Sequence, residues 1–398
     1  MIIPEQKRLS RKFLIYKFAT NLWFFGTVWL YFYRLFISDS QVGIVDAVAF
    51  FIGLLVEIPS GALADKFGRA RVTRIGLILM TVGFVVQALG GFWIFLTFQI
   101  GVTVGASLIS GADEALFYEK LKFKKTSHQW RDLLTRSGQV ALIASLSANV
   151  VGSLIHTFEP TLTWLLTGLA YLIAMAVIWN VKDEPTSQAP QTIRANLRDY
   201  FTDIAAGFRE FKKPQLRLYI PLIITVQGLF YAYGWGLLRL VLLSRFGFSP
   251  FWGSVAIASC ALISILVLHL TRKYSHKLSE KQIFTTIIFM AILGLVLAIF
   301  DLGLIGCAVL LLFYVGEHTT HPFISEIVNK AAKPQQRSTI LSIASFFKVL
   351  PYVLLAPIIG FLNDNNSLEI FLIAWAILSA LAWIYYLVAR KKNSYVAR

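Results

Sequence analysis

Apolar runs long enough to cross a bilayer follow one another along almost the whole chain, separated by short polar segments. A helix needs about 20 apolar residues to cross the hydrocarbon core of a membrane, and twelve runs of roughly this length can be read in order. They lie near 13–36, 43–64, 72–89, 92–112, 140–156, 162–181, 216–243, 252–270, 283–300, 302–323, 339–362 and 368–389. The pattern predicts an all-α membrane protein with twelve transmembrane helices.

One long hydrophilic segment, residues 182–215, divides the twelve runs into two sets of six. We therefore expect an N-terminal six-helix half over 1–181, a linker over 182–215 and a C-terminal six-helix half over 216–398. Apolar residues recur in the linker at helical spacing, which predicts an amphipathic helix on the cytoplasmic face. These residues are Ile193, Leu197, Tyr200, Phe201, Ile204, Phe208 and Phe211.

The two halves resemble a repeat with an offset of about 205 residues. Arg34 then corresponds to Arg239, and Gly111 corresponds to Gly316. Because these matches agree with the positions of the apolar runs, they predict two pseudo-symmetric halves, an arrangement known among membrane proteins.

Composition and charge placement narrow the class of protein. The chain is 57% hydrophobic and 15% charged, too apolar for a soluble globular protein. Its formal net charge of +16 would suit nucleic-acid binding, but the basic residues gather in both termini and in every second connection. The other connections are nearly free of them, with Arg245 as the exception. This is the positive-inside pattern, which predicts cytoplasmic termini and a basic surface facing membrane lipid, with no nucleic-acid partner.

A short basic turn follows the second apolar run, at 61–71. Its position between two runs of membrane length predicts a membrane-surface hairpin. Gly61 and Gly68 bracket the turn and favour close approach of the helix ends. Asp65 is its one acidic residue, and Arg69 follows four residues later.

These residues, with Leu63, resemble the signature between the second and third helices of the major facilitator superfamily. The stretches 110–118 and 337–342 are similar to segments of its bacterial members. The resemblance implies two six-helix halves in a bacterial cytoplasmic (inner) membrane and a central substrate site that alternates between the two sides. It also implies a gating motif, in which Asp65 lies against the start of the eleventh helix near Ser338 and Arg69 anchors the turn. The alternative is a turn that only sets topology.

Charged residues inside apolar spans are costly, so they are candidates for substrate or proton binding. Asp113 and Glu114 lie at the cytoplasmic end of the fourth span and are either functional or interfacial. Glu317 and Lys348 are expected at similar depth in the tenth and eleventh spans, as a structural pair or as a binding site. His318 follows Glu317 directly, with His321 one turn further on. A polar helix face is favoured there over a metal site, and no metal is predicted.

Arg34 and Arg239 occupy equivalent positions in the first and seventh spans. They resemble the arginine pair that clamps phosphate in organophosphate transporters of the same superfamily, and guanidinium groups suit such anion binding. Both lie near the outer ends of their spans, so snorkelling of the side chains to the interface is the alternative.

The chain contains no nucleotide-binding motif of the G-x-x-x-x-G-K-[ST] type, so an ion gradient is the expected energy source, with protons as the coupling ion. We expect a monomeric secondary active transporter, an antiporter for efflux of a small amphipathic compound. Import or exchange of an organic anion or phosphorylated metabolite is the alternative. An enzyme and a non-transporting receptor are the competing classes, and no cofactor is expected.

Overall fold

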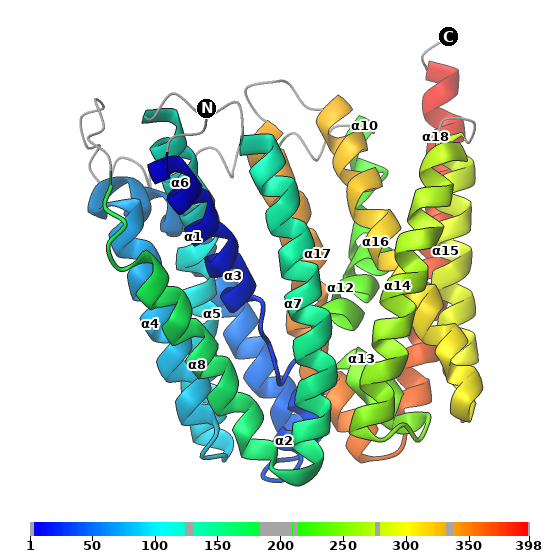
Figure 1. The fold of residues 1–398 in the computed structure, drawn as a ribbon. Helices are drawn as coiled ribbons and strands as arrows, with labels where there is room; N and C mark the ends of the chain where they lie inside the picture. The colour runs from blue at the N-terminus through cyan, green and yellow to red at the C-terminus, as the bar shows by residue number, and fades with distance from the viewer. Residues whose placement is uncertain are drawn as a thin grey trace. The chain divides into compact units, whose positions relative to one another are not determined.

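Every regular element in the described part of the chain is a helix (Figure 1). The computed structural model describes residues 4–123, 130–183, 209, 214–274, 279–331 and 337–396. Ten of its helices are long and apolar enough to cross a membrane, and a bent pair brings the number to eleven. The all-helical membrane fold is therefore confirmed. The amphipathic helix expected in 182–215 lies almost entirely outside the described residues.

The chain forms two compact units, Met1–Ile37 with Val48–Tyr200, and Ser38–Ala47 with Phe201–Arg398. The first contains α1 (Pro4–Thr20), α2 (Trp29–Tyr33), most of α3 (Asp39–Phe67), α4 (Arg69–Gln87), α5 (Phe92–Ile109), α6 (Ala112–Phe123), α7 (Trp130–Phe158) and α8 (Pro160–Ile178). The second contains α10 (Pro214–Arg217), α11 (Ile220–Leu222), the π-helix Ile223–Gln227, α12 (Gly228–Gly234), α13 (Leu238–Arg245), α14 (Pro250–Tyr274), α15 (Glu280–Leu297), the 3-10 turn Gly303–Ile305, α16 (Gly306–Ala331), α17 (Arg337–Asp364) and α18 (Leu368–Val396).

In the first unit α4 packs against α5 and α8 (Figure 1). A Cβ on Gly76 of α4 would lie 2.7 Å from the carbonyl oxygen of Gly105 on α5. Small residues of this kind let membrane helices pack closely. The opposite face of α4 exposes large apolar side chains at helical spacing, which suits contact with lipid: Ile75, Ile78, Val82 and Val85.

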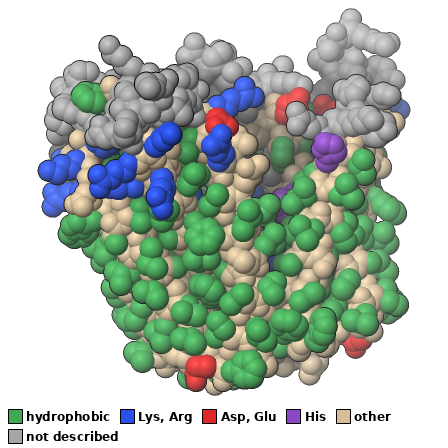
Figure 2. All heavy atoms as spheres, in the orientation of Figure 1, with side chains coloured by type: hydrophobic (Ala, Val, Ile, Leu, Met, Phe, Trp, Pro, Cys, Tyr) green, Lys and Arg blue, Asp and Glu red, His purple; other side chains and the backbone are tan. Residues whose placement is uncertain are grey.

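The surface side chains of the first unit are distributed as expected for a membrane protein. Over its helices, Figure 2 shows hydrophobic side chains on most of the visible face and Lys and Arg side chains gathered at one end. Hydrocarbon favours the first kind, and anionic headgroups favour the second.

The first apolar run, 13–36, is not one helix. The chain leaves helical geometry after Thr20 and resumes it at Trp29. Helix α8 provides partners for two of the freed backbone groups, because the Phe24 N–H donates to Thr167 Oγ1 at 3.1 Å and Tyr171 Oη donates to the Thr20 carbonyl at 3.0 Å. Non-helical backbone at membrane depth needs partners of this kind.

Gly152 of α7 lets the interrupted segment approach. A Cβ at this position would overlap the carbonyl oxygen of Phe24. Since an oxygen of the main chain cannot rotate away, the packing of α7 on this segment depends on the missing side chain.

The seventh run is interrupted as well, because α12 and α13 meet at an angle of 68°. At the bend Tyr352 Oη of α17 accepts a hydrogen bond from the Leu237 N–H at 2.9 Å and donates one to Asp46 of α3. Asp46 is only 4% exposed. The tyrosine hydroxyl thus satisfies two buried polar groups at once.

Arg245, the exception to the charge pattern, is paired at the end of α13. Its guanidinium lies 3.5 Å from Asp301 and 3.7 Å from Glu369, and it donates to the Ile299 carbonyl at 2.7 Å. Arg245 therefore links α13 to the segment 299–301 and to the start of α18.

Candidate functional site

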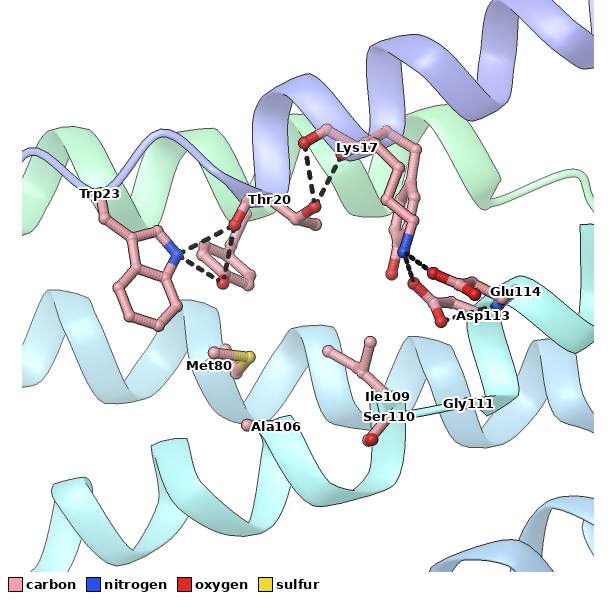
Figure 3. A pocket seen from close by; sticks show the side chains of 12 residues that line it. Lys17, Thr20, Trp23, Met80, Ala106, Ile109, Ser110, Gly111, Asp113 and Glu114 are labelled. Carbon is pink, nitrogen blue, oxygen red and sulfur yellow. Dashed lines mark hydrogen bonds and ion pairs between the residues drawn. The ribbon is translucent and has the colours of Figure 1, made fainter. Parts of the chain in front are cut away.

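The first unit contains an open cavity of about 280 Å³ lined by residues of α1, α4, α5, α6 and α8 (Figure 3). Charged side chains line one end of it. Lys17 Nζ lies 3.0 Å from Asp113 Oδ2 and 2.9 Å from Glu114 Oε1. The lysine and Asp113 side chains are 17% and 8% exposed, whereas Glu114 is 44% exposed. The Lys17 ammonium therefore forms ion pairs with two carboxylates in a largely buried position.

A break between α5 and α6 positions the two acids. Gly111 has φ +76°, a conformation that favours glycine, and α6 begins at the next residue. Asp113 and Glu114 consequently fall in the first turn of α6, where the helix dipole favours negative charge. Lys17 lies in the last turn of α1, where the dipole favours positive charge.

The other end of the cavity is aromatic. Trp23, from the interrupted segment, donates its indole N–H to the Thr20 carbonyl and to Tyr171 Oη, both at 2.9 Å. In Figure 3 this tryptophan lies at the end opposite to Lys17, with Met80 and Ala106 along the wall between them. The cavity is thus amphipathic along its length.

Tyr16, which also lines the cavity, is fully buried. Its hydroxyl interacts with the Asp113 carboxylate but makes no hydrogen bond of standard geometry with the described residues. Buried polar atoms are normally satisfied, so this hydroxyl is a group that a bound molecule could satisfy.

Sequence reasoning found two members of this cluster and missed the third. Asp113 and Glu114 were expected to be either functional or interfacial, and the structure brings both to Lys17. Lys17 could have been selected from the sequence, because Lys17 and Arg34 are the two charged residues within the apolar run 13–36. Asp46, buried against Tyr352, was not singled out either.

The basic turn differs from the predicted hairpin, because α3 continues through Gly61 and ends at Phe67. Gly68, at φ +92°, makes the break. A Cβ on Gly61 would meet no described atom within 4 Å, whereas one on Gly68 would overlap the Asp183 carboxylate. A carboxylate side chain, and not a helix end, therefore approaches Gly68 closely, and the expected close approach of helix ends at Gly61 and Gly68 stays a prediction.

Arg69 connects the turn to α6. Its guanidinium lies 3.3 Å from Asp65 Oδ1 and 2.7 Å from Glu119 Oε1. The start of α17, to which the resemblance assigns Asp65, belongs to the second unit. The role of Gly61, Asp65, Gly68 and Arg69 as a gating motif stays a prediction.

The second unit holds another group of charges, beside the bend between α12 and α13. Glu317 of α16 interacts electrostatically with His318, Arg239 and Lys348. Gly234 allows this, because a Cβ there would overlap the Glu317 carboxylate. Lys348 Nζ also lies 5.3 Å from the centroid of the Tyr231 ring.

His318 itself is exposed. Its ring stacks on Tyr314 at a centroid distance of 4.8 Å, and its Nδ1 lies 2.9 Å from the Tyr314 carbonyl oxygen. No cluster of three or more metal-ligating side chains occurs in the described ranges.

The two arginines of the predicted clamp lie at the end of α2 and in the first turn of α13. Arg34 and Arg239 belong to different units, so their cooperation stays a prediction. Arg239 Nε is buried and has no hydrogen-bond partner among the described residues.

Comparison with known proteins agrees with the all-helical membrane fold. The sequence model of the Major Facilitator Superfamily matches residues 13–350. A search of curated proteins gave no match.

Solved structures of similar fold include the nucleoside transporter NupG, with a TM-score of 0.74, 14% identity and coverage of 98% of this chain and 100% of that chain. A D-xylose-proton symporter matches with a TM-score of 0.69 and 12% identity, over 96% of each chain. A POT family transporter solved in complex with a thioalcohol-conjugated peptide matches with a TM-score of 0.67 and 13% identity, over 98% of this chain and 96% of that chain. Identities this low establish the fold alone.

Proposed function

Because the chain belongs to the major facilitator superfamily and is therefore a multi-pass membrane transporter, we propose that it exports a small amphipathic compound in exchange for protons. The cavity of the first unit is the proposed place of both events. The observation that carries this proposal is the cluster of Lys17, Asp113 and Glu114 at one end of a cavity whose other end carries Trp23.

Charge balance supports proton coupling. With all three groups ionised, the cluster has one positive and two negative charges, and the surplus is costly in a site of low polarity. A proton on one carboxylate leaves a neutral ion pair. Glu114 is the more exposed of the two acids, so we propose that protons enter and leave the cluster through it.

The shape of the cavity supports an amphipathic substrate. Binding sites for small molecules combine apolar walls with a few convergent polar groups. Here the polar groups are at one end and Trp23 is at the other. A compound with one charged and one apolar end would satisfy both.

We propose that the turn between α3 and α4 controls the conformational change of the transporter. Arg69 holds Asp65 of α3 and Glu119 of α6 together. We infer that release and formation of this turn's contacts accompany the alternation of the substrate site between the two faces of the membrane. We further propose a monomer in a bacterial inner membrane, with both termini in the cytoplasm.

A second candidate is the import or exchange of an organic anion or a phosphorylated metabolite. Arg239 favours it, because a buried guanidinium nitrogen without a hydrogen-bond partner among the described residues suits an anionic ligand. Fold relatives that are named as a nucleoside transporter and a D-xylose-proton symporter also point to polar metabolites.

The test is a flux assay with purified protein in liposomes that enclose a pH-sensitive dye. Amphipathic amines, organic phosphates and nucleosides are added outside in separate experiments. We expect one class to cause protein-dependent proton movement, Glu114→Gln to abolish it, and the surface variant Asp132→Asn to retain it. Substrate flux without proton movement would refute the coupling, and flux of organic phosphates that depends on Arg239 would support the second candidate.

A further inference from the structure

The charged end of the first-unit cavity is occupied by an ammonium group that belongs to the protein. Lys17 Nζ is within 3.0 Å of one oxygen from each of two neighbouring carboxylates. Two carboxylates at the start of α6 therefore hold a single ammonium, and that ammonium is attached to a flexible side chain. An amine of similar size on another molecule would find the same two partners.

The opposite end suits a ring. Trp23 is fixed there by its two hydrogen bonds to Thr20 and Tyr171. A fixed aromatic face binds other rings by stacking, and it also attracts positive charge. In Figure 3 no charged side chain is drawn at this end, and all three charged residues are at the other.

Tyr16, which interacts with the Asp113 carboxylate, gives a further sign that the cavity accepts a polar ligand. Its side chain is 0% exposed, it lines the cavity, and its hydroxyl makes no hydrogen bond of standard geometry with the described residues. A tyrosine hydroxyl can accept a hydrogen bond from an ammonium N–H. A ligand amine beside Asp113 would thus give this hydroxyl a hydrogen bond of standard geometry.

The cavity volume of about 280 Å³ limits the ligand to a small molecule. We propose that the cavity binds a primary or secondary arylalkylamine, with the ammonium between Asp113 and Glu114 and the ring against Trp23. Lys17 is the internal competitor, which holds the carboxylates when the ligand is absent and is displaced when it binds. This inference rests on the proposed transport function and specifies the substrate class for the same site.

The two possible roles of Lys17 have opposite consequences. If Lys17 competes with the ligand, removing its charge strengthens binding of amines. If Lys17 instead contacts an anionic ligand, removing its charge weakens binding. The variant Lys17→Gln therefore decides between the two by the direction of the change.

The experiment measures binding by calorimetry and by thermal shift, with the full chain in lipid nanodiscs. The probes are 2-phenylethylamine, the neutral 2-phenylethanol and the anionic 3-phenylpropionate. We expect the amine alone to bind, with affinity increased about tenfold in Lys17→Gln and decreased about tenfold in Glu114→Gln, since hydrogen bonds to charged groups have this magnitude. Tyr16→Phe should weaken amine binding, and Asp132→Asn, which alters an exposed ion pair on α7, should not.

Three results would overturn the inference: no binding of the amine, equal binding of amine and alcohol, or weaker amine binding in Lys17→Gln. If Lys17→Gln fails to fold, Glu114→Gln and Tyr16→Phe test the same contacts, and unchanged amine affinity in both overturns it as well. Flux measured in parallel separates the two proposals. Amine binding with the expected variant pattern but no flux refutes the transport function, whereas flux of another class without amine binding refutes only the substrate class.

Discussion

Asp183 Oδ1 accepts a hydrogen bond from the Ala70 N–H at 2.9 Å, so a residue that follows α8 caps the start of α4. The Asp183 carboxylate fits there because Gly68, two residues before Ala70, has no side chain and leaves room for it. Four N–H groups at a helix start lack partners within the helix, and an acid there also interacts favourably with the helix dipole. The turn that resembles the superfamily signature is therefore stabilised from the segment that leads into the linker.

This contact predicts the effect of Gly68→Ala. The substitution should cost about 1–3 kcal/mol, because φ +92° with ψ +134° is a conformation that only glycine adopts readily, and it should further displace Asp183. Gly91→Ala is the matched control, because Gly91 also precedes a helix at positive φ but has open space around its Cβ position. Thermal unfolding should show a larger loss for Gly68→Ala. In an Asp183→Ala background the two losses should become equal, and a persisting difference would rule out this explanation.

A second prediction concerns Asp65. Its ion pair with Arg69 is exposed and contributes about 0–1 kcal/mol. Asp65→Asn should therefore leave membrane insertion and the thermal midpoint nearly unchanged while reducing transport. Asp132→Asn removes a comparable exposed pair, with Arg136 on α7, and should leave both transport and stability intact. Full flux in Asp65→Asn would eliminate the gating role.

Gly152 provides a test of the interrupted first span. An added methyl group would collide with the Phe24 carbonyl, and overpacking against backbone typically costs about 1–3 kcal/mol. Gly138→Ala, on the same helix, meets no described atom within 4 Å and should be neutral or slightly stabilising because alanine favours helix. The thermal midpoints of the two variants should shift in opposite directions from that of the unsubstituted protein, or differ clearly from each other. Equal melting would mean that the packing of α7 on this segment is unimportant.

Lys17 has a stability consequence that can be measured without a ligand. Removing one partner of a buried ion pair typically costs about 3–5 kcal/mol, because the remaining charge is left uncompensated. Lys17→Gln should therefore lower the thermal midpoint. Adding Glu114→Gln to that variant removes one of the two repelling carboxylates and should restore part of the loss. No recovery in the double variant would show that the pairing is energetically minor.

A last prediction concerns the bend between α12 and α13. Tyr352→Phe removes the acceptor of the Leu237 N–H and the donor to Asp46. Leaving buried polar groups without partners costs about 1–3 kcal/mol. We expect lower thermal stability in this variant, whereas Tyr385→Phe, at a half-exposed tyrosine of α18, should have little effect. A similar midpoint for both variants would contradict the assigned role of Tyr352.

Sequence patterns predicted the fold because membrane insertion depends on local properties. The length of an apolar run and the sign of the charges beside it are readable without knowing the partners of a helix. For the same reason Asp113 and Glu114 could be selected, since an acid within an apolar span stands out.

The missed features depend on contacts between residues far apart in the chain. The pairing of Lys17 requires α1 and α6 to meet, and nothing near position 17 announces this. The interruption after Thr20 is stabilised by Thr167 and Tyr171 on α8, so the run 13–36 reads as one continuous helix when considered alone. The turn was predicted over 61–71, whereas the break lies at Gly68 alone, because the two glycines look equivalent until the backbone angle is known.

The interrupted first span has a consequence for how the protein is made. Its free carbonyl and N–H groups find partners on α8, whose residues leave the ribosome more than a hundred positions later. Until that helix arrives, the nascent amino-terminal segment has unsatisfied polar groups and is unsuited to lie alone in hydrocarbon. The interrupted form of this segment therefore depends on α8 and can become stable only after α8 has been synthesised.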